Sequence, residues 1–595
     1  MGLLFNMPFQ LTLAVFTAAY LLAGAGVLYR AGTNITKGDI FDENLLMCIA
    51  TLGAFAIKAF PEAVSVMLFY KVGQLLENIA VNNSQKSIKA LLDIRPDHAN
   101  IMTDDGMKQV DPGEVMPGDF IVVKPGERIP LDGIILEGNS FVDTSAITGE
   151  PAPRSVKSGD GILSGFVNQS GTLTVKTTKT LNESAASRIL ELVQNAASNK
   201  APTENFITRF ARFYTPAVVV AAVILALFPP VLSGNMNFST WVYRALLFLV
   251  VSCPCALVIS IPLGFFAGIG TASRKGILVK GGNYLEALNG INTVVFDKTG
   301  TLTKGVFKAT EFAVYNGFSR FELLEYAAIA EAHSDHPIAK SIKEAYGKNI
   351  DLAKIVSYEQ IPGYGVKASV GGLEILAGND RLLHRSGNIE HDTCGIQGTV
   401  VHVAVNNIYA GYIIISDEVR EDAARTISAL RELGEIRIAM LTGDSELSAG
   451  SIAGKLGIDE YYAGLLPEEK LERLKAIKES SYKSRLVFVG DGINDAPVLA
   501  MADIGVAMGG LGSDAAIEAS DIVLMTDEPY KLVEAVKTAG KTRSIVWQNI
   551  IFAMGVKLIV LVLGAGGIAT MWEAVFADVG VTLIAVFNAL RVLRS

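Results

Sequence analysis

The chain has 595 residues, of which 50% are hydrophobic and 19% are charged, and its formal net charge is −9. It is too long for a single hydrophobic core, and soluble domains carry about 25% charged residues, so the composition indicates a membrane protein with large soluble parts. The acidic balance argues against a nucleic-acid partner, and the cysteines (Cys48, Cys253, Cys255 and Cys394) do not have the spacing of a disulfide scaffold.

Seven apolar segments predict membrane-spanning helices, since a span needs about 20 mostly apolar residues. They cover residues 8–29, 43–59, 61–80, 213–234, 241–268, 547–566 and 570–591. The first segment lacks a basic region followed by a small-residue cleavage site, so we do not expect a removable signal peptide. An odd number of spans places the two ends of the chain on opposite sides of the membrane. Either one span is miscounted or one helix is missing at the start of the chain, and we expect the second.

Two polar stretches interrupt the apolar segments. Residues 81–212 contain short alternating runs rich in Val, Gly and Asp, which predict a β-rich domain. Residues 273–546 alternate strand-like and helical segments, which predict a parallel α/β sheet. Lysine and arginine residues flank the spans on the side that carries both stretches, and the positive-inside rule makes that side the cytoplasm.

Three strand-like runs of the second stretch end in polar side chains. The first ends at Asp297, the second precedes Thr442, and the third precedes Asp491 and Asp495. Because the carboxyl ends of parallel strands meet at one edge of a sheet, these side chains should surround one point. Hard oxygen ligands suit Mg²⁺ and its phosphate partners, and Asp297 could attack a phosphoryl group to form an aspartyl-phosphate. The alternative is that three unrelated turns follow apolar strands by coincidence.

The motifs DKTGTLT at residues 297–303, TGD at 442–444 and GDGINDAP at 490–497 resemble, in this order and spacing, those of the P-type ATPases. The resemblance implies that ATP phosphorylates Asp297, that the insertion between Asp297 and Thr442 binds the nucleotide, and that residues 81–212 form the actuator domain. Thr148-Gly149-Glu150 matches the actuator loop, whose Glu positions water at the phosphoenzyme. In isolation, this tripeptide would be interpreted as a turn.

The resemblance also assigns roles residue by residue. We expect catalytic roles for Asp297, Glu150, Thr148, Gly149, Lys470, Thr299, Thr442 and Asp495, and Mg²⁺ ligands at Asp297, Thr299 and Asp491. We expect ATP contacts at Glu331, His336, Gly363, Gly365, Lys298, Gly443, Asp444 and Asn494. His336 resembles the His-Pro element of heavy-metal pumps, in which the imidazole packs on adenine. The alternative for His336 is a histidine that caps a helix.

Cys253-Pro254-Cys255 lies inside the fifth predicted span. On an intact helix the two thiols would point to nearly opposite sides, but a proline disrupts the helix, so both sulfurs can face one site. Thiolates select soft or borderline ions such as Cu⁺, Zn²⁺, Cd²⁺ and Pb²⁺. The alternative is a pair of small buried side chains beside a kink. This tripeptide, in the span before the phosphorylation domain, resembles the hallmark of heavy-metal pumps.

Lys557 and Asp578 interrupt the last two predicted spans, and charges inside a membrane are costly enough to indicate function. A carboxylate joined to two thiolates suits a divalent borderline ion. The pair resembles that of the branch that exports Zn²⁺, Cd²⁺ and Pb²⁺. This implies that Cys253, Cys255 and Asp578 bind the transported ion and that Lys557 acts as a counter-ion.

The same branch implies roles at the ends of the ion path. Glu62 matches an acidic residue used for ion release, and Glu43 matches one at the cytoplasmic entrance. Gln74 stands where a further entrance glutamate is expected, so part of this path differs. We interpret Met47 and Cys48 as lipid-facing packing residues.

We therefore predict a multidomain membrane protein. It combines an α-helical transmembrane bundle with a β-rich actuator domain and a haloacid-dehalogenase-like α/β phosphorylation domain that carries an inserted α+β nucleotide-binding domain. The predicted boundaries are 1–80 for the first transmembrane helices, 81–212 for the actuator domain, 213–272 for the helices with Cys-Pro-Cys, 273–307 and 421–546 for the phosphorylation domain, 308–420 for the nucleotide-binding domain, and 547–595 for the last two helices.

The expected function is ATP-driven export of Zn²⁺, with Cd²⁺ and Pb²⁺ as alternatives. We expect a monomer in a prokaryotic plasma membrane, with the catalytic domains in the cytoplasm. A Cu⁺ exporter is disfavoured by Lys557 and Asp578. A membrane-anchored phosphatase of the haloacid-dehalogenase type would need neither the Thr-Gly-Glu loop nor Cys-Pro-Cys, and a passive channel regulated by nucleotide would conduct without turnover.

Overall fold

The computed structural model describes residues 9–36, 43–91, 96, 98–103, 106–148, 153–196, 200–232, 238–252, 255–334, 336–352, 355–361, 364–385, 389, 393, 399–444, 446–480, 485–491, 495–509 and 514–594. The chain forms two compact units. The first comprises Met1–Asn289 with Glu534–Ser595, and the second comprises Gly290–Val533.

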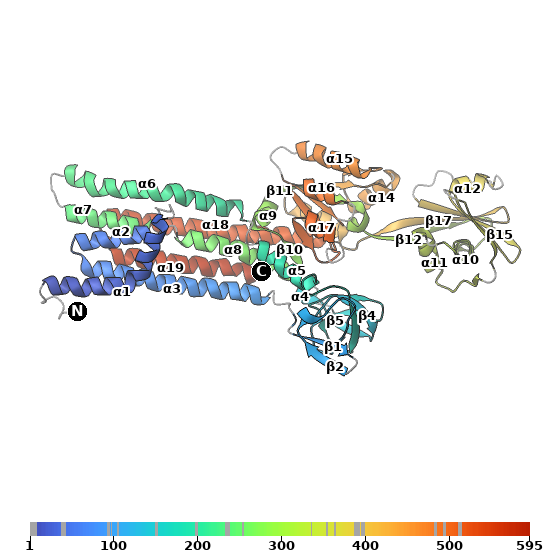
Figure 1. The fold of residues 1–595 in the computed structure, drawn as a ribbon. Coiled ribbons are helices and arrows are strands. Elements are labelled where there is room, and N and C mark those ends of the chain that lie inside the picture. The colour runs from blue at the N-terminus through green and yellow to red at the C-terminus, as the bar shows by residue number, and fades with distance from the viewer. Residues whose placement is uncertain are drawn as a thin grey trace. The chain divides into compact units, whose positions relative to one another are not determined.

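Long apolar helices make up one part of the first unit (Figure 1). They are α1 (Phe9–Thr36), α2 (Glu43–Ala56), α3 (Phe60–Leu91), α6 (Pro202–Leu232), α7 (Phe238–Val251), α8 (Cys255–Arg274), α18 (Tyr530–Ala565) and α19 (Met571–Ala589). Within the described residues, 5 helical segments are long and apolar enough to cross a membrane: Phe9–Thr36, Phe213–Leu232, Phe238–Arg274, Tyr530–Ala565 and Met571–Arg594. The predicted spans 43–59 and 61–80 form α2, which is short, and α3, whose apolar residues are interrupted by charged ones.

The fifth predicted span is divided into two helices. The first, α7, ends at Val251, and the second, α8, begins at Cys255. Residues 253 and 254 between them lie outside the described residues.

Met47 and Cys48 belong to the buried core of the apolar helices. Their exposed fractions are 6% and 4%, and they lie in one apolar cluster with Tyr20, Met67 and Leu247. Helix α2 packs against α1, α3 and α7, so this side of α2 is covered by other helices. The interpretation of Met47 and Cys48 as lipid-facing residues is therefore wrong.

The predicted β-rich domain is also part of the first unit. One sheet has the order β2-β1-β3-β9-β4-β7, and a smaller one has the order β6-β5-β8. The strands are β1 (Ala99–Thr103), β2 (Gly106–Val110), β3 (Phe120–Val123), β4 (Gly133–Glu137), β5 (Ser140–Asp143), β6 (Arg154–Val156), β7 (Gly161–Ile162), β8 (Val167–Asn168) and β9 (Leu173–Thr177), followed by helix α5 (Ala185–Ala196). Alternating buried positions such as Leu173 and Val175 form its core.

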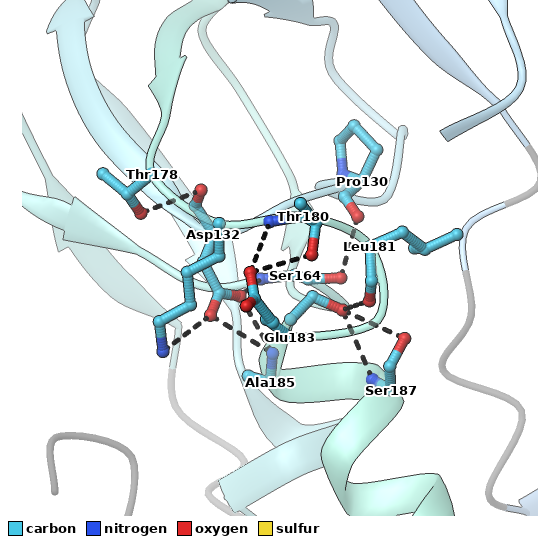
Figure 2. Close-up of polar contacts among 11 residues, drawn as sticks. Pro130, Asp132, Ser164, Thr178, Thr180, Leu181, Glu183, Ala185 and Ser187 are labelled. Atoms are coloured by element: carbon cyan, nitrogen blue, oxygen red, sulfur yellow. Dashed lines mark hydrogen bonds and ion pairs between the residues drawn. The ribbon is translucent and has the colours of Figure 1, made fainter. Parts of the chain in front are cut away.

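A buried carboxylate attaches α5 to these strands (Figure 2). Asp132 is 3% exposed, and its carboxylate accepts hydrogen bonds from the backbone N–H of Ser164 (2.9 Å) and of Ala185 (3.1 Å). Lys179 lies 3.7 Å from the same carboxylate. A negative charge at the first turn of a helix also interacts favourably with the helix dipole. Asp132 therefore holds the start of α5 to the β-rich domain.

The second unit contains a parallel sheet with the strand order β22-β21-β20-β11-β18-β19. These strands are β11 (Ile291–Asp297), β18 (Arg437–Leu441), β19 (Glu460–Tyr462), β20 (Arg485–Gly490), β21 (Ile504–Ala507) and β22 (Ile522–Leu524). Val294, Val295 and Phe296 of β11 are fully buried, as expected for a central parallel strand covered on both faces. Helices α13 (Ala423–Glu432), α14 (Glu446–Leu456), α15 (Pro467–Ser480) and α16 (Ala496–Met501) belong to this sheet's domain.

An antiparallel sheet is inserted between β11 and β18. Its strand order is β12-β17-β16-β15-β14-β13, with β12 (Thr303–Val314), β13 (Ile355–Ile361), β14 (Gly365–Val370), β15 (Leu373–Gly378), β16 (Thr399–Val405) and β17 (Ile408–Val419). Helix α10 (Arg320–Ala330) begins with a capping box between Ser319 and Glu322, and α11 (Pro337–Tyr346) ends at Gly347 in the left-handed region. The predicted fold class is confirmed in all its parts.

Candidate catalytic and ion-binding sites

Asp297 is the last residue of β11, the strand between β18 and β20. It is 4% exposed, and Thr442, which follows β18, is 1% exposed. Asp491 follows β20 directly. The structure therefore brings these three predicted residues to the same carboxyl edge of the parallel sheet, where doubly wound α/β proteins bind their ligands.

Lys470 of α15 joins two of the buried carboxylates. Its Nζ lies 2.6 Å from Oδ1 of Asp297 and 3.1 Å from Oδ1 of Asp495, the residue before α16. Burial and the neighbouring Asp495 raise the pKa of Asp297 to about 7, although Lys470 opposes the rise. Burial alone would lower the pKa of Lys470, but the two carboxylates raise it above its usual value. Lys470 therefore stays protonated beside Asp297, where its positive charge can offset negative charge.

The predicted phosphorylation loop, residues Lys298–Leu302, follows Asp297. Gly300 has φ 77°, and a Cβ at this position would lie 2.9 Å from Oδ2 of Asp491, so glycine is favoured here. Nη2 of Arg420 donates a hydrogen bond to the Gly300 carbonyl at 2.8 Å. Lys298 is 2% exposed and forms an ion pair with Asp444. The two residues were predicted to contact ATP, and the structure pairs them with each other.

The oxygen ligands at this edge fit the Mg²⁺ that the fold implies. Mg²⁺ is usually held by one or two carboxylates together with substrate phosphates and water. Asp297 and Asp491 supply two carboxylates, and the exposed Thr299 lies in the loop between them. Among the residues that the structure describes, no group of three or more His, Cys, Asp or Glu side chains is arranged to hold a metal ion. The donor set therefore suits a shared Mg²⁺–phosphate site.

Glu331, His336 and Gly365, three of the predicted nucleotide contacts, lie in the inserted domain. Glu331 follows α10 and is 8% exposed, and burial raises its pKa. His336 stands at the start of α11, and its Nδ1 accepts a hydrogen bond from the N–H of Ile338 at 3.3 Å. This is the capping role of the alternative interpretation, and the exposed side chain of His336 is still open to a ligand. Lys343 holds the connection between the two helices by donating to the Ser334 carbonyl at 2.8 Å.

Gly365 lies beside a second glycine that sequence reasoning missed. Gly365 has φ 145°, and a Cβ there would come within 2.3 Å of the Ala377 carbonyl and 2.5 Å of Cα of Gly378. The register pairs Gly365 with Gly378 across β14 and β15. No local pattern marks Gly378, because its role depends on the pairing of the two strands. Gly363 and Asn494 lie outside the described residues.

The predicted actuator loop begins at the end of α4 (Ser145–Thr148). Thr148 is 8% exposed, and its hydroxyl donates to the carbonyl of Thr144 at 3.1 Å. Gly149 and Glu150 lie outside the described residues. Their expected role in positioning water therefore remains a prediction.

Lys557 of α18 and Asp578 of α19 meet among the apolar helices. Nζ of Lys557 lies 2.5 Å from Oδ1 of Asp578 and 3.1 Å from the carbonyl oxygen of Val251. Val251 is the last residue of α7, so this carbonyl belongs to the helix end beside the Cys-Pro-Cys motif. The contact of this carbonyl with Lys557 was not predicted, because no sequence pattern pairs a backbone carbonyl with a distant lysine. Cys253 and the side chain of Cys255 lie outside the described residues.

Of the residues considered for the ends of the ion path, the structure describes the side chains of Glu62 and Gln74. Glu62 lies in the first turn of α3 and is half-buried. Gln74 donates from Nε2 to the hydroxyl of Tyr70 at 3.0 Å. Glu43 is the first residue of α2, and the structure does not describe its side chain.

Comparisons with known proteins agree with this geometry. Residues 291–503 match the family described as haloacid dehalogenase-like hydrolase, and residues 93–194 match the P-type ATPase actuator domain. The chain is 58% identical over 581 residues to the cadmium, zinc and cobalt-transporting ATPase of Bacillus subtilis (98% of this chain, 83% of the relative). It is 56% identical over 592 residues to the zinc-transporting ATPase of Synechocystis (99% of this chain, 82% of the relative).

A solved structure extends the similarity to nearly the whole fold. It is the crystal structure of a zinc-transporting PIB-type ATPase in the E2.Pi state. The TM-score is 0.62 at 36% sequence identity, and the match covers 99% of this chain and 96% of that chain.

Proposed function

This chain belongs to the heavy-metal-transporting P-type ATPases, and we propose that it uses ATP to export Zn²⁺ or Cd²⁺ from the cytoplasm through a phosphoenzyme at Asp297. Two of the relatives carry zinc or cadmium transport in their names. The ion pair of Lys557 and Asp578 beside the Val251 carbonyl is the observation that carries the choice of ion. A carboxylate with two thiolates suits a divalent borderline ion better than Cu⁺.

The first chemical step is phosphoryl transfer at the carboxyl edge of the parallel sheet. An oxygen of the Asp297 carboxylate attacks the γ-phosphorus of ATP, an acyl phosphate forms, and the bond to the leaving ADP oxygen breaks. Lys470 lies 2.6 Å from Asp297 and offsets negative charge on the transferring group. Mg²⁺, bound by Asp297, Thr299 and Asp491, would neutralise phosphate charge when present. Thr442 and Asp495 complete the polar surroundings of Asp297. The proposed nucleotide contacts are Glu331, His336, Gly363, Gly365, Lys298, Gly443, Asp444 and Asn494.

The second chemical step is hydrolysis of the acyl phosphate. Glu150, presented by Thr148 and Gly149, positions a water molecule that attacks phosphorus, which frees inorganic phosphate and restores the Asp297 carboxylate. The ion leaves on the outer side, past Glu62. Transport requires that the affinity for the ion differs between the two states, because equal affinities shift no equilibrium.

The ion itself is bound by Cys253, Cys255 and Asp578, and Lys557 is the counter-ion. Pb²⁺ shares the chemistry of this donor set and is a further candidate. We infer a monomer in a prokaryotic plasma membrane, with both soluble parts in the cytoplasm, since Lys and Arg residues flank the spans on that side.

The decisive experiment measures ATP hydrolysis by the purified protein with Zn²⁺, Cd²⁺, Pb²⁺, Co²⁺ and Cu⁺ in turn. We expect stimulation by Zn²⁺ and Cd²⁺, and its loss in Cys255→Ser, because a hydroxyl is a poorer ligand than a thiolate for a borderline ion. Cys48→Ser is the matched control, since Cys48 is buried among the same helices but lies outside the proposed site.

Three results would contradict the proposal. Stimulation by Cu⁺ alone would identify a copper exporter, and hydrolysis that no metal affects would favour a membrane-anchored phosphatase. Metal uptake into vesicles without ATP would favour a passive channel.

A further inference from the structure

Residues 420–425, here called the coupling segment, contact the phosphorylation loop on one side. The backbone N–H of Arg420 donates to the Leu302 carbonyl at 3.0 Å, and Nη2 of its side chain donates to the Gly300 carbonyl at 2.8 Å. The Arg420 side chain is 12% exposed. Arg420 therefore fixes two peptide groups of the loop that begins directly after Asp297.

The same segment contacts the beginning of α18 on its other side. The carboxylate of Asp422 accepts a hydrogen bond from the N–H of Tyr530, the first residue of α18, at 3.0 Å. The guanidinium carbon of Arg425 lies 4.0 Å from the centre of the Tyr530 ring. Nη2 of Arg420 lies 3.7 Å from Oδ2 of Asp527, shortly before that helix. Two side chains of the coupling segment thus contact the first residue of α18, and a third contacts Asp527 just before it.

The position of Asp422 makes its contact with Tyr530 informative. Asp422 occupies the N-cap position of α13, where an aspartate normally accepts a hydrogen bond from its own helix. Its side chain makes no such bond and instead caps α18. The Asp422 carboxylate therefore links the start of α13 to the start of α18 and does not cap α13.

Helix α18 connects this junction to the proposed ion site. It is 36 residues long and contains both Tyr530 and Lys557. We propose that Arg420 and Asp422 are positioning residues that couple the state of the phosphorylation loop to α18, and through it to Lys557 and Asp578. This inference rests on the proposed function, because it needs both a phosphoenzyme and a transported ion.

Thermodynamic linkage makes the coupling measurable from either end. If ion binding changes the affinity for phosphate, phosphate must change the affinity for the ion by the same factor, typically about 5-fold to 150-fold. Phosphorylation of Asp297 by inorganic phosphate occurs in the ion-free state, so Zn²⁺ should suppress it. A variant with a weaker junction should still be phosphorylated by inorganic phosphate, but Zn²⁺ should suppress this phosphorylation less.

The test titrates Zn²⁺ against phosphorylation by inorganic phosphate in the purified full-length chain. In Asp422→Ala, we expect the Zn²⁺ concentration for half suppression to rise about tenfold, which lies within the usual range for coupled sites. Asp422→Asn keeps an oxygen acceptor for Tyr530 and should stay within about twofold of the wild type. Glu421→Ala removes the same charge from the neighbouring exposed position and should behave as the wild type.

The outcomes separate this inference from the proposed function. Wild-type protein that inorganic phosphate does not label, or whose labelling Zn²⁺ does not affect, would overturn the proposed function itself. Normal Zn²⁺ suppression in Asp422→Ala, or the same loss in Glu421→Ala, would overturn only the coupling role. If Asp422→Ala fails to fold, Arg425→Gln is the second variant, because it removes the contact with the Tyr530 ring. It should show the same reduced sensitivity to Zn²⁺. Normal sensitivity in Arg425→Gln would also overturn the coupling role.

Discussion

Lys557 and Asp578 form an ion pair of 2.5 Å between α18 and α19, and the same ammonium donates to the Val251 carbonyl at 3.1 Å. The two side chains are 5% and 12% exposed, so neither charge is compensated by bulk water. Breaking such a pair from one side leaves an uncompensated buried charge. A transported cation bound to Asp578 would repel Lys557, and its departure would let the ion pair form again.

Lys557→Ala should therefore bind Zn²⁺ in the inward-facing state but transport it poorly, because no internal cation replaces the ion at Asp578 after release. Its dephosphorylation should also depend less on other cations. The measurements are Zn²⁺ affinity and ATP-driven uptake into vesicles. If Lys557 only neutralises Asp578, the variant should misfold or lose binding, and Lys557→Ala with Asp578→Asn should recover it. Transport at the wild-type rate by Lys557→Ala would end the counter-ion role.

Asp297→Asn should abolish the acid-stable phosphoenzyme, because an amide cannot act as the nucleophile. The raised pKa of Asp297 adds a pH dependence: below a pH of about 7 the protonated acid is a poor nucleophile, so labelling by ATP should decrease as the pH falls. Lys470 lowers the pKa of Asp297, and Lys470→Gln should therefore move this decrease to a higher pH. Labelling of Asp297→Asn by radioactive ATP would contradict the assignment.

Glu150→Gln should have the opposite effect on the phosphoenzyme. Its formation from ATP does not involve the water that Glu150 positions, so labelling should reach the wild-type level. Decay after a chase with unlabelled ATP should slow by about 100-fold or more, the usual contribution of a general acid or base. A wild-type decay rate would remove Glu150 from the mechanism.

The arrangement of the candidate catalytic site could be predicted because its signal is local. Asp297 is the last residue of β11, Thr442 and Asp491 directly follow β18 and β20, and the topology of a parallel sheet brings the three together. The ion pair of Lys298 and Asp444 joins residues far apart in sequence, and no spacing rule indicates it. It also shows that a residue assigned to ATP can already have a partner within the protein.

Which side of an apolar helix faces lipid and which packs against protein was harder to predict. Met47 and Cys48 of the short, mostly apolar α2 were assigned to the lipid side, but they lie with the polar Asn44 and Thr51 among the buried residues. Arg420 shows another limit, because a single arginine after a strand has no distinctive pattern. Its importance follows only from the Gly300 carbonyl and the Asp527 carboxylate that the fold places beside it.

Asp132→Ala should weaken the attachment of α5 to the β-rich domain (Figure 2). The N–H groups of Ser164 and Ala185 would lose their acceptor, and each buried unsatisfied donor costs about 1–3 kcal/mol. Hydrogen exchange of peptides from α5 and residues 161–168 should become faster. Asp132→Asn keeps an acceptor oxygen and should have a smaller effect, and Asp111→Ala removes an exposed aspartate of the same domain as a control. Unchanged exchange in Asp132→Ala would contradict this role.

Gly365→Ala should impair the use of ATP without impairing the chemistry at Asp297. A Cβ at Gly365 would lie 2.3 Å from the Ala377 carbonyl and 2.5 Å from Cα of Gly378, so β14 and β15 must separate where the nucleotide is expected to bind. Gly371 is the matched control, since its φ of 60° is also positive but a Cβ there meets nothing within 4 Å.

The measurements for Gly365→Ala and Gly371→Ala are the KM for ATP and the labelling by inorganic phosphate. Backbone strain in the left-handed α region costs about 1–2 kcal/mol in Gly371→Ala, and φ 145° at Gly365 adds strain of its own, so the phosphate labelling described below serves as the test for a general disturbance. A specific effect on the nucleotide site should therefore raise the KM for ATP about tenfold or more in Gly365→Ala alone, since one lost interaction of about 1.4 kcal/mol is a tenfold change. Labelling by inorganic phosphate needs no nucleotide and should persist in both variants. An equal loss of phosphate labelling in Gly365→Ala would instead indicate that the substitution disturbs the fold beyond the nucleotide site, and Gly365 would then have only a structural role.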